Sequence, residues 1–315
     1  MNKRTHNNDN ALKKIIKAPF ITKTFATLGE RLLLSKHHEC SAPQLFILGR
    51  PRSGTTLIYQ YIAHRLNVSY FTFGVGKHPY APCITTLAQR KLHGHYSSSF
   101  ESHYGKDALG NAVAPREAGA WWNRFFDKDN YVEFDNLEKK HIRQIRNTVA
   151  CVQNIFGGMP FINKNVKHLL RIEALGQIFP NSKFLIVERD IEDVAISILR
   201  GRHENLLDAS QWWSVRPPDY AELVGLPVEK QIARQCISLK QKMEVDLSKL
   251  PNERVIRIQY KDFCNAPEDL VRKIISAIDT SETGNPKQPL FKISRSCPQT
   301  QEEIALIELI GELNK

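Results

Sequence analysis

The stretch Gln44–Thr56, QLFILGRPRSGTT, decides the fold of this chain. It begins with the apolar run QLFIL, which reads as a short buried strand. The loop GRPRSGTT follows at once, and Leu57–Leu66 then has the pattern of a helix. A strand, a glycine-containing loop and a helix in this order are the repeating unit of a parallel sheet.

Two more units of the same kind lie further along the chain. The run KFLIV at Lys183–Val187 leads into a predicted helix at Ile191–Leu199. The run RVIRI at Arg254–Ile258 comes before a predicted helix at Pro267–Ile278. Strands that alternate with helices predict an α/β fold with a mainly parallel sheet flanked by helices, in three layers.

The loop of the first unit has the features of an anion site. Gly49 and Gly54 permit a tight turn and a close approach of the backbone. The turn exposes successive backbone N–H groups, and the following helix presents its positive N-terminus to the same place. Ser53, Thr55 and Thr56 add hydroxyl donors. We therefore expect this P-loop-like segment to bind a phosphate group.

The loop differs from the ATP-binding pattern GxxxxGK[ST], whose lysine reaches the β- and γ-phosphates. Thr55 occupies the position of that lysine, and the cations Arg50 and Arg52 lie inside the loop instead. This arrangement argues against a standard nucleoside triphosphatase. It suits a donor with one 5′-phosphate rather than a metal-bound triphosphate.

Composition sets wider bounds. The 315 residues include 42% hydrophobic residues, enough to bury a large core, and the net charge is +11. The excess of positive charge favours an anionic partner. No basic-aromatic repeat or recognition motif indicates nucleic acid, so we expect none. A non-catalytic protein that binds an anionic polymer stays open as an alternative.

Six cysteines lie far apart, without metal-ligand spacing, and favour a reduced, cytoplasmic chain with no metal site. No run is long enough to span a membrane, and no secretory signal is recognisable. Residues 1–40 form a basic lead-in of helical character, with eight Lys or Arg against three Asp or Glu. Residues 11–35 predict either a helix packed on the domain or peripheral membrane contact. We expect residues 41–315 to form one domain.

The loop PRSGTT resembles the 5′-phosphosulfate loop of sulfotransferases that use 3′-phosphoadenosine-5′-phosphosulfate (PAPS), above all the bacterial and tyrosylprotein-type branches. The segment Asn163–Arg200 is similar to a second motif of that family, although Ile191 stands where the family usually has proline. The resemblance implies that Arg189 and Ser197, eight residues apart, bind the 3′-phosphate. The alternatives for Arg189 are a salt bridge with a neighbouring carboxylate and a Walker B-like site built on Glu188.

The same resemblance extends to Tyr260, in Tyr260-Lys-Asp-Phe263, which would contact the adenine. A core tyrosine is the alternative. The family's activity would be transfer of a sulfuryl group to a hydroxyl or amine, with release of 3′,5′-bisphosphoadenosine (PAP) and no required metal. Arg52 and Lys164 match positions that stabilise charge on the leaving phosphate, and a solvated loop lysine is the alternative for Lys164. A P-loop kinase or another ATP-dependent phosphotransferase is the alternative enzyme.

The base that accepts the acceptor's proton is not fixed by the motifs. The candidate base is Glu117, which lies in an aromatic segment before the second motif. Its alternative role is an ion pair with Arg116 or Arg124. The rival bases are His78, His93, His95 and His103. Residues 70–134 are rich in aromatic residues and predict an acceptor-side insertion, to which Trp212 and Trp213 would add. The acceptor itself stays open among small molecules, lipids and glycans.

Overall fold

A computed structural model of the chain describes residues 19–35, 42–98, 100, 102–103, 106–107, 111–206, 208, 210–288, 290–293 and 295–313. Its centre is a sheet of four parallel strands in the order β4-β1-β5-β6. The strands are β4 (Phe161–Lys164), β1 (Gln44–Leu48), β5 (Lys183–Glu188) and β6 (Val255–Gln259). Ser102–His103 (β2) and Lys106–Asp107 (β3) form a separate antiparallel pair.

Helices account for most of the remaining regular structure. The α-helices are α2 (Pro19–Leu34), α3 (Thr55–Arg65), α4 (Pro82–His93), α5 (Gly119–Trp122), α6 (Lys139–Ile155), α7 (Ile172–Ile178), α8 (Ile191–Asn205), α9 (Tyr220–Leu223), α10 (Val228–Leu247), α11 (Tyr260–Asn265), α12 (Pro267–Ile278) and α13 (Gln301–Leu313). The 3₁₀ turns are η1 (Phe73–Gly76), η2 (Phe134–Asn136), η3 (Val166–Leu170) and η4 (Asn252–Arg254).

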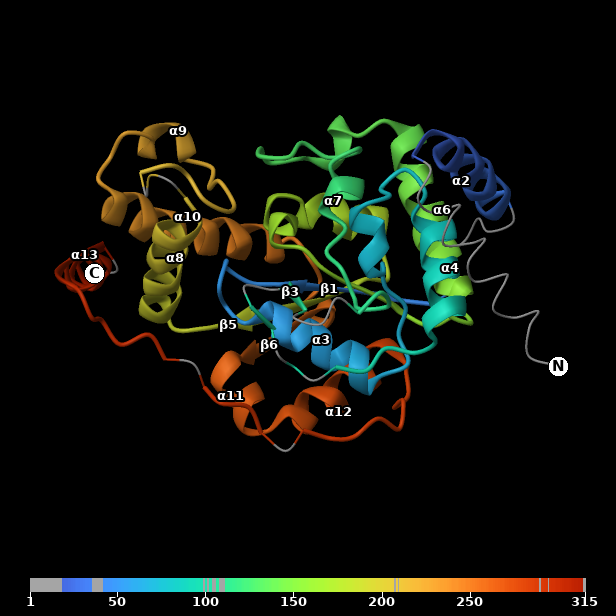
Figure 1. Ribbon diagram of the computed structural model, residues 1–315. Coiled ribbons are helices and arrows are strands. Elements are labelled where there is room, and N and C mark those ends of the chain that lie inside the picture. The colour runs from blue at the N-terminus through green and yellow to red at the C-terminus, as the bar shows by residue number, and fades with distance from the viewer. Residues whose placement is uncertain are drawn as a thin grey trace.

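Strand β1 is buried on both faces, which explains its unbroken apolar run. Because side chains alternate along a strand, Phe46 and Leu48 pack into one layer with α5, α6, α7 and α10. Leu45 and Ile47 pack into the opposite layer with α3, α11 and α12. Figure 1 shows the sheet between these two layers, with α3, α11 and α12 below it. The predicted three-layer α/β fold is confirmed.

All three predicted strand–helix units are present, although α8 runs six residues beyond its predicted end at Leu199 and the short helix α11 lies between β6 and the predicted helix α12. Helix α3 begins two residues before the predicted start, and β6 begins one residue later. The fourth strand, β4, was not predicted. Its sequence FINK ends in polar residues, yet all four side chains are buried. Asn163 lies in this strand and accepts hydrogen bonds from Trp122 Nε1 and His168 Nε2, at 3.1 and 2.8 Å.

The basic lead-in contributes one described helix. Helix α2 packs against α4 and α6 at the end of the molecule opposite α13 (Figure 1). The carboxylate of Glu30 accepts hydrogen bonds from the backbone N–H groups of Cys83 and Ile84, at the start of α4. Leu28 and Leu32 on the same helix are exposed. Residues 1–18 and 36–41 lie outside the described residues, so the alternative of membrane contact stays a prediction.

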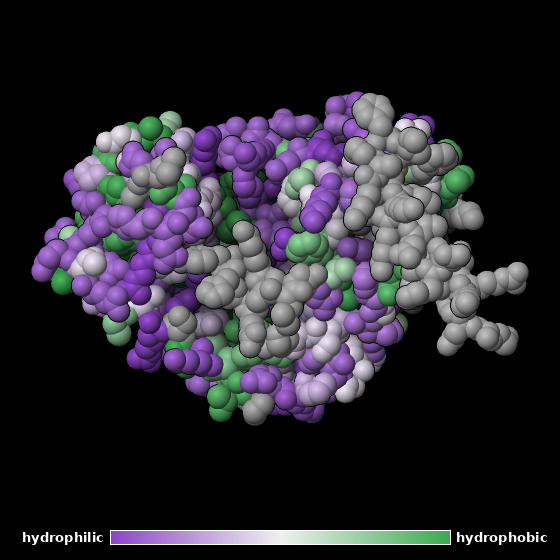
Figure 2. Space-filling view, viewed as in Figure 1, coloured by the Kyte–Doolittle hydropathy of each residue, from purple (hydrophilic) through white to green (hydrophobic). Residues whose placement is uncertain are grey.

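The molecular surface is mostly hydrophilic on the face shown in Figure 2, with hydrophobic residues in scattered patches. Within the described ranges, no helix is long and apolar enough to cross a bilayer. The aromatic residues between positions 70 and 134 are mainly internal. Trp121 and Trp122 are fully buried, and Phe71 packs against both of them. These side chains stabilise the core.

Candidate anion-binding and transfer site

The carboxyl ends of the four parallel strands meet at one edge of the sheet, where open α/β sheets bind ligands. Each strand delivers a residue of interest to this edge. Gly49 follows β1, Lys164 ends β4, Arg189 follows β5 and Tyr260 follows β6. Residues that are more than two hundred positions apart in sequence are thereby brought to the same side of the molecule.

The loop after β1 is a tight turn with strained backbone. Ser53 N donates a hydrogen bond to Arg50 O at 3.1 Å, which closes a four-residue turn around Pro51. Arg52 has a φ of 69°, a left-handed conformation that costs a non-glycine residue about 1–3 kcal/mol. A Cβ atom on Gly49 would lie 2.8 Å from Val187 O, so only glycine fits between the loop and β5.

Unsatisfied donors converge on this loop. Gly54 is the N-cap residue of α3 and offers no side-chain cap to the N–H groups of the first helical turn. Among the described residues, the fully buried Ser53 Oγ and Arg50 Nη1 have no hydrogen-bond partner. Buried polar atoms normally have partners. Their presence next to an uncapped helix N-terminus is the arrangement that binds an anion.

Three residues of the predicted phosphate sites are in direct contact. Arg52 Nε donates to Ser197 Oγ at 3.0 Å, and Arg189 Nη1 donates to Arg52 O at 3.0 Å. Burial lowers the pKa of Arg52, and the neighbouring cation Arg189 lowers it further. Two guanidinium groups held this close create a site that favours negative charge. Arg189 also lies 3.6 Å from the Asp193 carboxylate, so the salt bridge considered as its alternative role is present too.

Tyr260 covers the loop at the start of α11. Its ring is 7% exposed, and the Arg189 guanidinium lies 5.0 Å from the ring centroid. The ring packs against Gly54, where any Cβ atom would clash with it. Burial raises the pKa of the Tyr260 phenol. Tyr260 and Arg189 line a cavity of about 480 Å³, which also includes Arg295 and Ser296 of the C-terminal segment, two residues that sequence analysis missed.

Lys164 and Glu117 form an ion pair beside a second cavity. Its volume is about 290 Å³, and Thr56 of the phosphate loop lies in the same wall. Glu117 therefore pairs with Lys164 rather than with Arg116 or Arg124. Ala118, the next residue, also lines the cavity and has a φ of 51°, a strained backbone conformation for a residue other than glycine. The structure thus brings together the proposed base, a cation and the loop.

Of the histidines considered as rival bases, His78, His93 and His95 do not line this cavity. His78 Nδ1 lies 3.1 Å from the Tyr80 hydroxyl, and His93 and His95 are exposed at the end of α4. The side chain of His103 lies outside the described part of the structure.

The carboxylate of Glu188, which a Walker B-like site would need, is engaged by neighbouring side chains. Glu188 accepts a hydrogen bond from Arg257 Nη1 at 3.0 Å and another from Gln259 Nε2 at 2.5 Å. In the described residues, no group of three His, Cys, Asp or Glu side chains is placed to hold a metal ion.

Sequence analysis also missed Gln60 and Tyr59, which line the cavity with Thr56. A signal for Gln60 was available. It lies four residues after Thr56 on α3, so both side chains face the same side of the helix.

Fold and site together define an α/β protein with a loop of unpartnered buried donors at the carboxyl edge of a parallel sheet. Residues 43–283 of the chain match the model of the sulfotransferase family. The chain belongs to this family, and transfer of sulfate groups is the activity that its membership supports. No curated protein sequence matches the chain at a significant level.

Several solved structures are similar to this chain. A sulfotransferase from Mycobacterium avium superposes with a TM-score of 0.51 at 17% sequence identity, over 93% of this chain and 73% of that one. A sulfotransferase from Mycobacterium tuberculosis gives 0.47 at 13% identity, over 90% and 77%. One from Alicyclobacillus acidocaldarius gives 0.45 at 13% identity, over 86% and 92%. The Mycobacterium avium protein has the same fold as this chain.

Proposed function

We propose that the protein transfers a sulfuryl group from PAPS to a hydroxyl or amine acceptor and releases PAP. The observation that carries this proposal is the contact of Arg52, Arg189 and Ser197 beside a loop with unpartnered buried donors. Two separate phosphate groups on one nucleotide would match two adjacent anion sites.

The residues at the strand ends fit such a donor. Ser53, Thr55, Thr56 and the first N–H groups of α3 would hold the 5′-phosphosulfate, together with Arg50. Arg189 and Ser197 would hold the 3′-phosphate, for which the planar fork of arginine is well suited. The Tyr260 ring would lie beside the adenine, where stacking contributes roughly 1–3 kcal/mol. The bound donor would supply an activated sulfuryl group.

The proposed transfer step uses the Glu117–Lys164 pair. Glu117 accepts the proton of the acceptor hydroxyl while the acceptor oxygen forms a bond to sulfur. The bond between that sulfur and the bridging oxygen of the 5′-phosphate breaks, and the electron pair stays on PAP. Lys164 and Arg52 stabilise the charge that develops there, each by about 2–4 kcal/mol if they act like other electrostatic groups of this kind.

Other properties stay predictions. We expect no metal requirement, because the donor carries no triphosphate. A cytoplasmic location rests on the cysteine content alone. The acceptor classes are small molecules, lipids and glycans, and no nucleic acid is expected.

Isothermal titration calorimetry without metal tests the proposal. We expect PAP to bind at least tenfold more tightly than 5′-AMP, because the 3′-phosphate adds charge-assisted hydrogen bonds worth about 1.5–3 kcal/mol. ATP with magnesium should bind more weakly than PAP. Tighter binding of ATP with magnesium would reject the sulfotransferase proposal in favour of a kinase.

A further inference from the structure

The cavity beside Glu117 and Lys164 is small and has a restricted lining. Its volume of about 290 Å³ is just below the range of roughly 300–1,000 Å³ that small-molecule sites occupy. Much of its wall is made of small residues, namely Gly76, Ala114, Pro115, Ala118, Gly119 and Ala120. Tyr59 is the one aromatic residue among the described lining residues. The space therefore suits a compact molecule such as a single sugar ring rather than a flat polycyclic one.

Arg116 is a fixed cation in this wall. Its guanidinium carbon lies 4.2 Å from the centroid of the Phe73 ring, and its side chain is only partly exposed. The backbone on both sides is held: Arg116 N donates to Phe71 O at 2.8 Å, and Arg116 O accepts from the Tyr59 hydroxyl at 3.3 Å. Nowhere in the described residues does a carboxylate form an ion pair with Arg116. Glu117, its neighbour in sequence, is engaged by Lys164.

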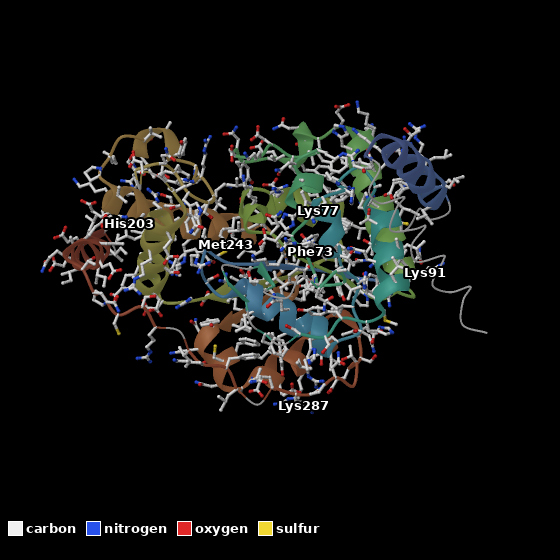
Figure 3. All side chains as sticks on the ribbon, in the orientation of Figure 1. Phe73, Lys77, Lys91, His203, Met243 and Lys287 are labelled. Carbon is white, nitrogen blue, oxygen red and sulfur yellow. The ribbon has the colours of Figure 1, made fainter. Side chains whose placement is uncertain are left out.

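Lys77 is a second cation next to this wall in sequence. It follows Gly76, which lines the cavity, and its Nζ lies 5.7 Å from the centroid of the same Phe73 ring. Figure 3 shows Phe73 and Lys77 near each other in the middle of the molecule, with Lys91 well apart from them on α4. Within the part of the chain that the structure describes, Lys77 has no acidic partner. Two cations, Arg116 and Lys164, therefore line the cavity against the single carboxylate of Glu117, and Lys77 lies over the same Phe73 ring as Arg116.

Gln60 adds a neutral hydrogen-bonding group. It is 4% exposed and lines the cavity, and its Oε1 atom is buried without a partner among the described residues. A buried amide oxygen left unpaired costs about 1–3 kcal/mol. A hydroxyl group of a molecule in the cavity would satisfy it.

We propose that the acceptor is a compact hydroxylated molecule that carries a phosphate or carboxylate group. Arg116 binds this anionic group with help from Lys77, and Gln60 accepts a hydrogen bond from a hydroxyl. The arginine fork matches either anion, because both present two oxygens in one plane. This inference rests on the proposed function, which makes the cavity beside Glu117 the acceptor site.

The test is a calorimetric titration of the PAP-saturated protein with three matched probes: glucose, glucuronate and glucose 6-phosphate. PAP fills the donor anion sites, so a remaining preference for anions reports on the cavity. We expect at least one anionic probe to bind tenfold or more tightly than glucose. Arg116→Gln should abolish this preference, and Lys77→Gln should reduce it. Lys91→Gln removes the same charge far from the cavity and should leave the preference intact.

Several outcomes would overturn the inference. These are equal or undetectable binding of all three probes, a preference that survives in Arg116→Gln, and a preference that Lys91→Gln reduces as much as Lys77→Gln does. PAP affinity within twofold of wild type shows that each variant is folded. A preference for glucuronate alone identifies a carboxylate, and one for glucose 6-phosphate alone identifies a phosphate.

Failure of the proposed function is a separate result, seen as absence of PAP binding in the wild type. The same titrations on protein without PAP then still compare wild type with Arg116→Gln, so the preference for anionic probes is tested in either case.

Discussion

Replacing Gly54 by alanine should damage both stability and donor binding. Gly54 has a φ of 88°, a left-handed conformation that costs alanine about 1–2 kcal/mol. The added Cβ atom would also overlap the ring of Tyr260, including its Cζ atom at 3.1 Å. Because Tyr260 is 7% exposed, the ring must move out of a packed position. We expect the free energy of unfolding to fall by about 2–4 kcal/mol in total, and PAP affinity to fall at least tenfold.

Gly225 provides a matched control for the cost of placing alanine at a positive φ. Its φ is 87°, and a Cβ atom there would meet nothing within 4 Å. Gly225→Ala should therefore lose only about 1–2 kcal/mol and keep PAP affinity. Urea unfolding measures the stability of both variants, and calorimetry measures PAP binding. Equal destabilisation by the two substitutions, together with unchanged PAP affinity in Gly54→Ala, would refute the close packing of loop and ring.

Three further predictions concern stability and the base. Arg65 lowers the pKa of Glu268 from 4.5 to about 2, so this contact stabilises the fold above about pH 4.5 and is lost as the pH falls toward 2. Glu268→Gln should cost about 1–2 kcal/mol at pH 7 in urea unfolding, allowing for solvent screening; a penalty that persists unchanged at about pH 3 would contradict this. Glu117→Gln should slow sulfuryl transfer by about 10²–10⁴ with unchanged PAP affinity, whereas His78→Asn should not; the opposite pattern would make the histidine the base. Trp122→Phe removes a buried indole N–H and should lower the free energy of unfolding by about 1–3 kcal/mol, visible as a lower urea midpoint; an unchanged midpoint would show that the indole hydrogen bond contributes nothing net.

Local patterns predicted the parts of the fold that follow from periodicity. The apolar run QLFIL predicted a strand buried on both faces. The glycines of the loop after it predicted a tight turn, and the structure requires glycine at Gly49 and Gly54 because of close packing and a positive φ. The strand β4 was missed because its buried polar residues look like a loop in sequence. Asn163 is acceptable in the core only because Trp122 and His168 donate hydrogen bonds to it, and those partners come from other elements.

In the candidate site, too, local motifs could be predicted from the sequence, whereas contacts between distant elements could not. Arg52, Arg189 and Ser197 were singled out from motifs, and the structure brings them into contact. Their roles toward a nucleotide stay proposals. The pairing of Glu117 with Lys164 was not predictable, because the two residues lie 47 positions apart and no motif links them. Aromatic residues in residues 70–134 suggested an acceptor surface, but a sequence does not tell buried tryptophans such as Trp121 from exposed ones.

The central claim is that Arg189 binds the 3′-phosphate of the sulfuryl donor. The most direct test measures the affinities of PAP and 5′-AMP, without metal, for wild type, Arg189→Ala and Arg257→Ala. Arg257 lies in the middle of β6, the strand next to β5, and pairs with Glu188 and Glu244, so it controls for the loss of charge. We predict that the preference for PAP over 5′-AMP, tenfold or more, disappears in Arg189→Ala alone. A preference that survives in Arg189→Ala, or that is absent from the wild type, would contradict the account.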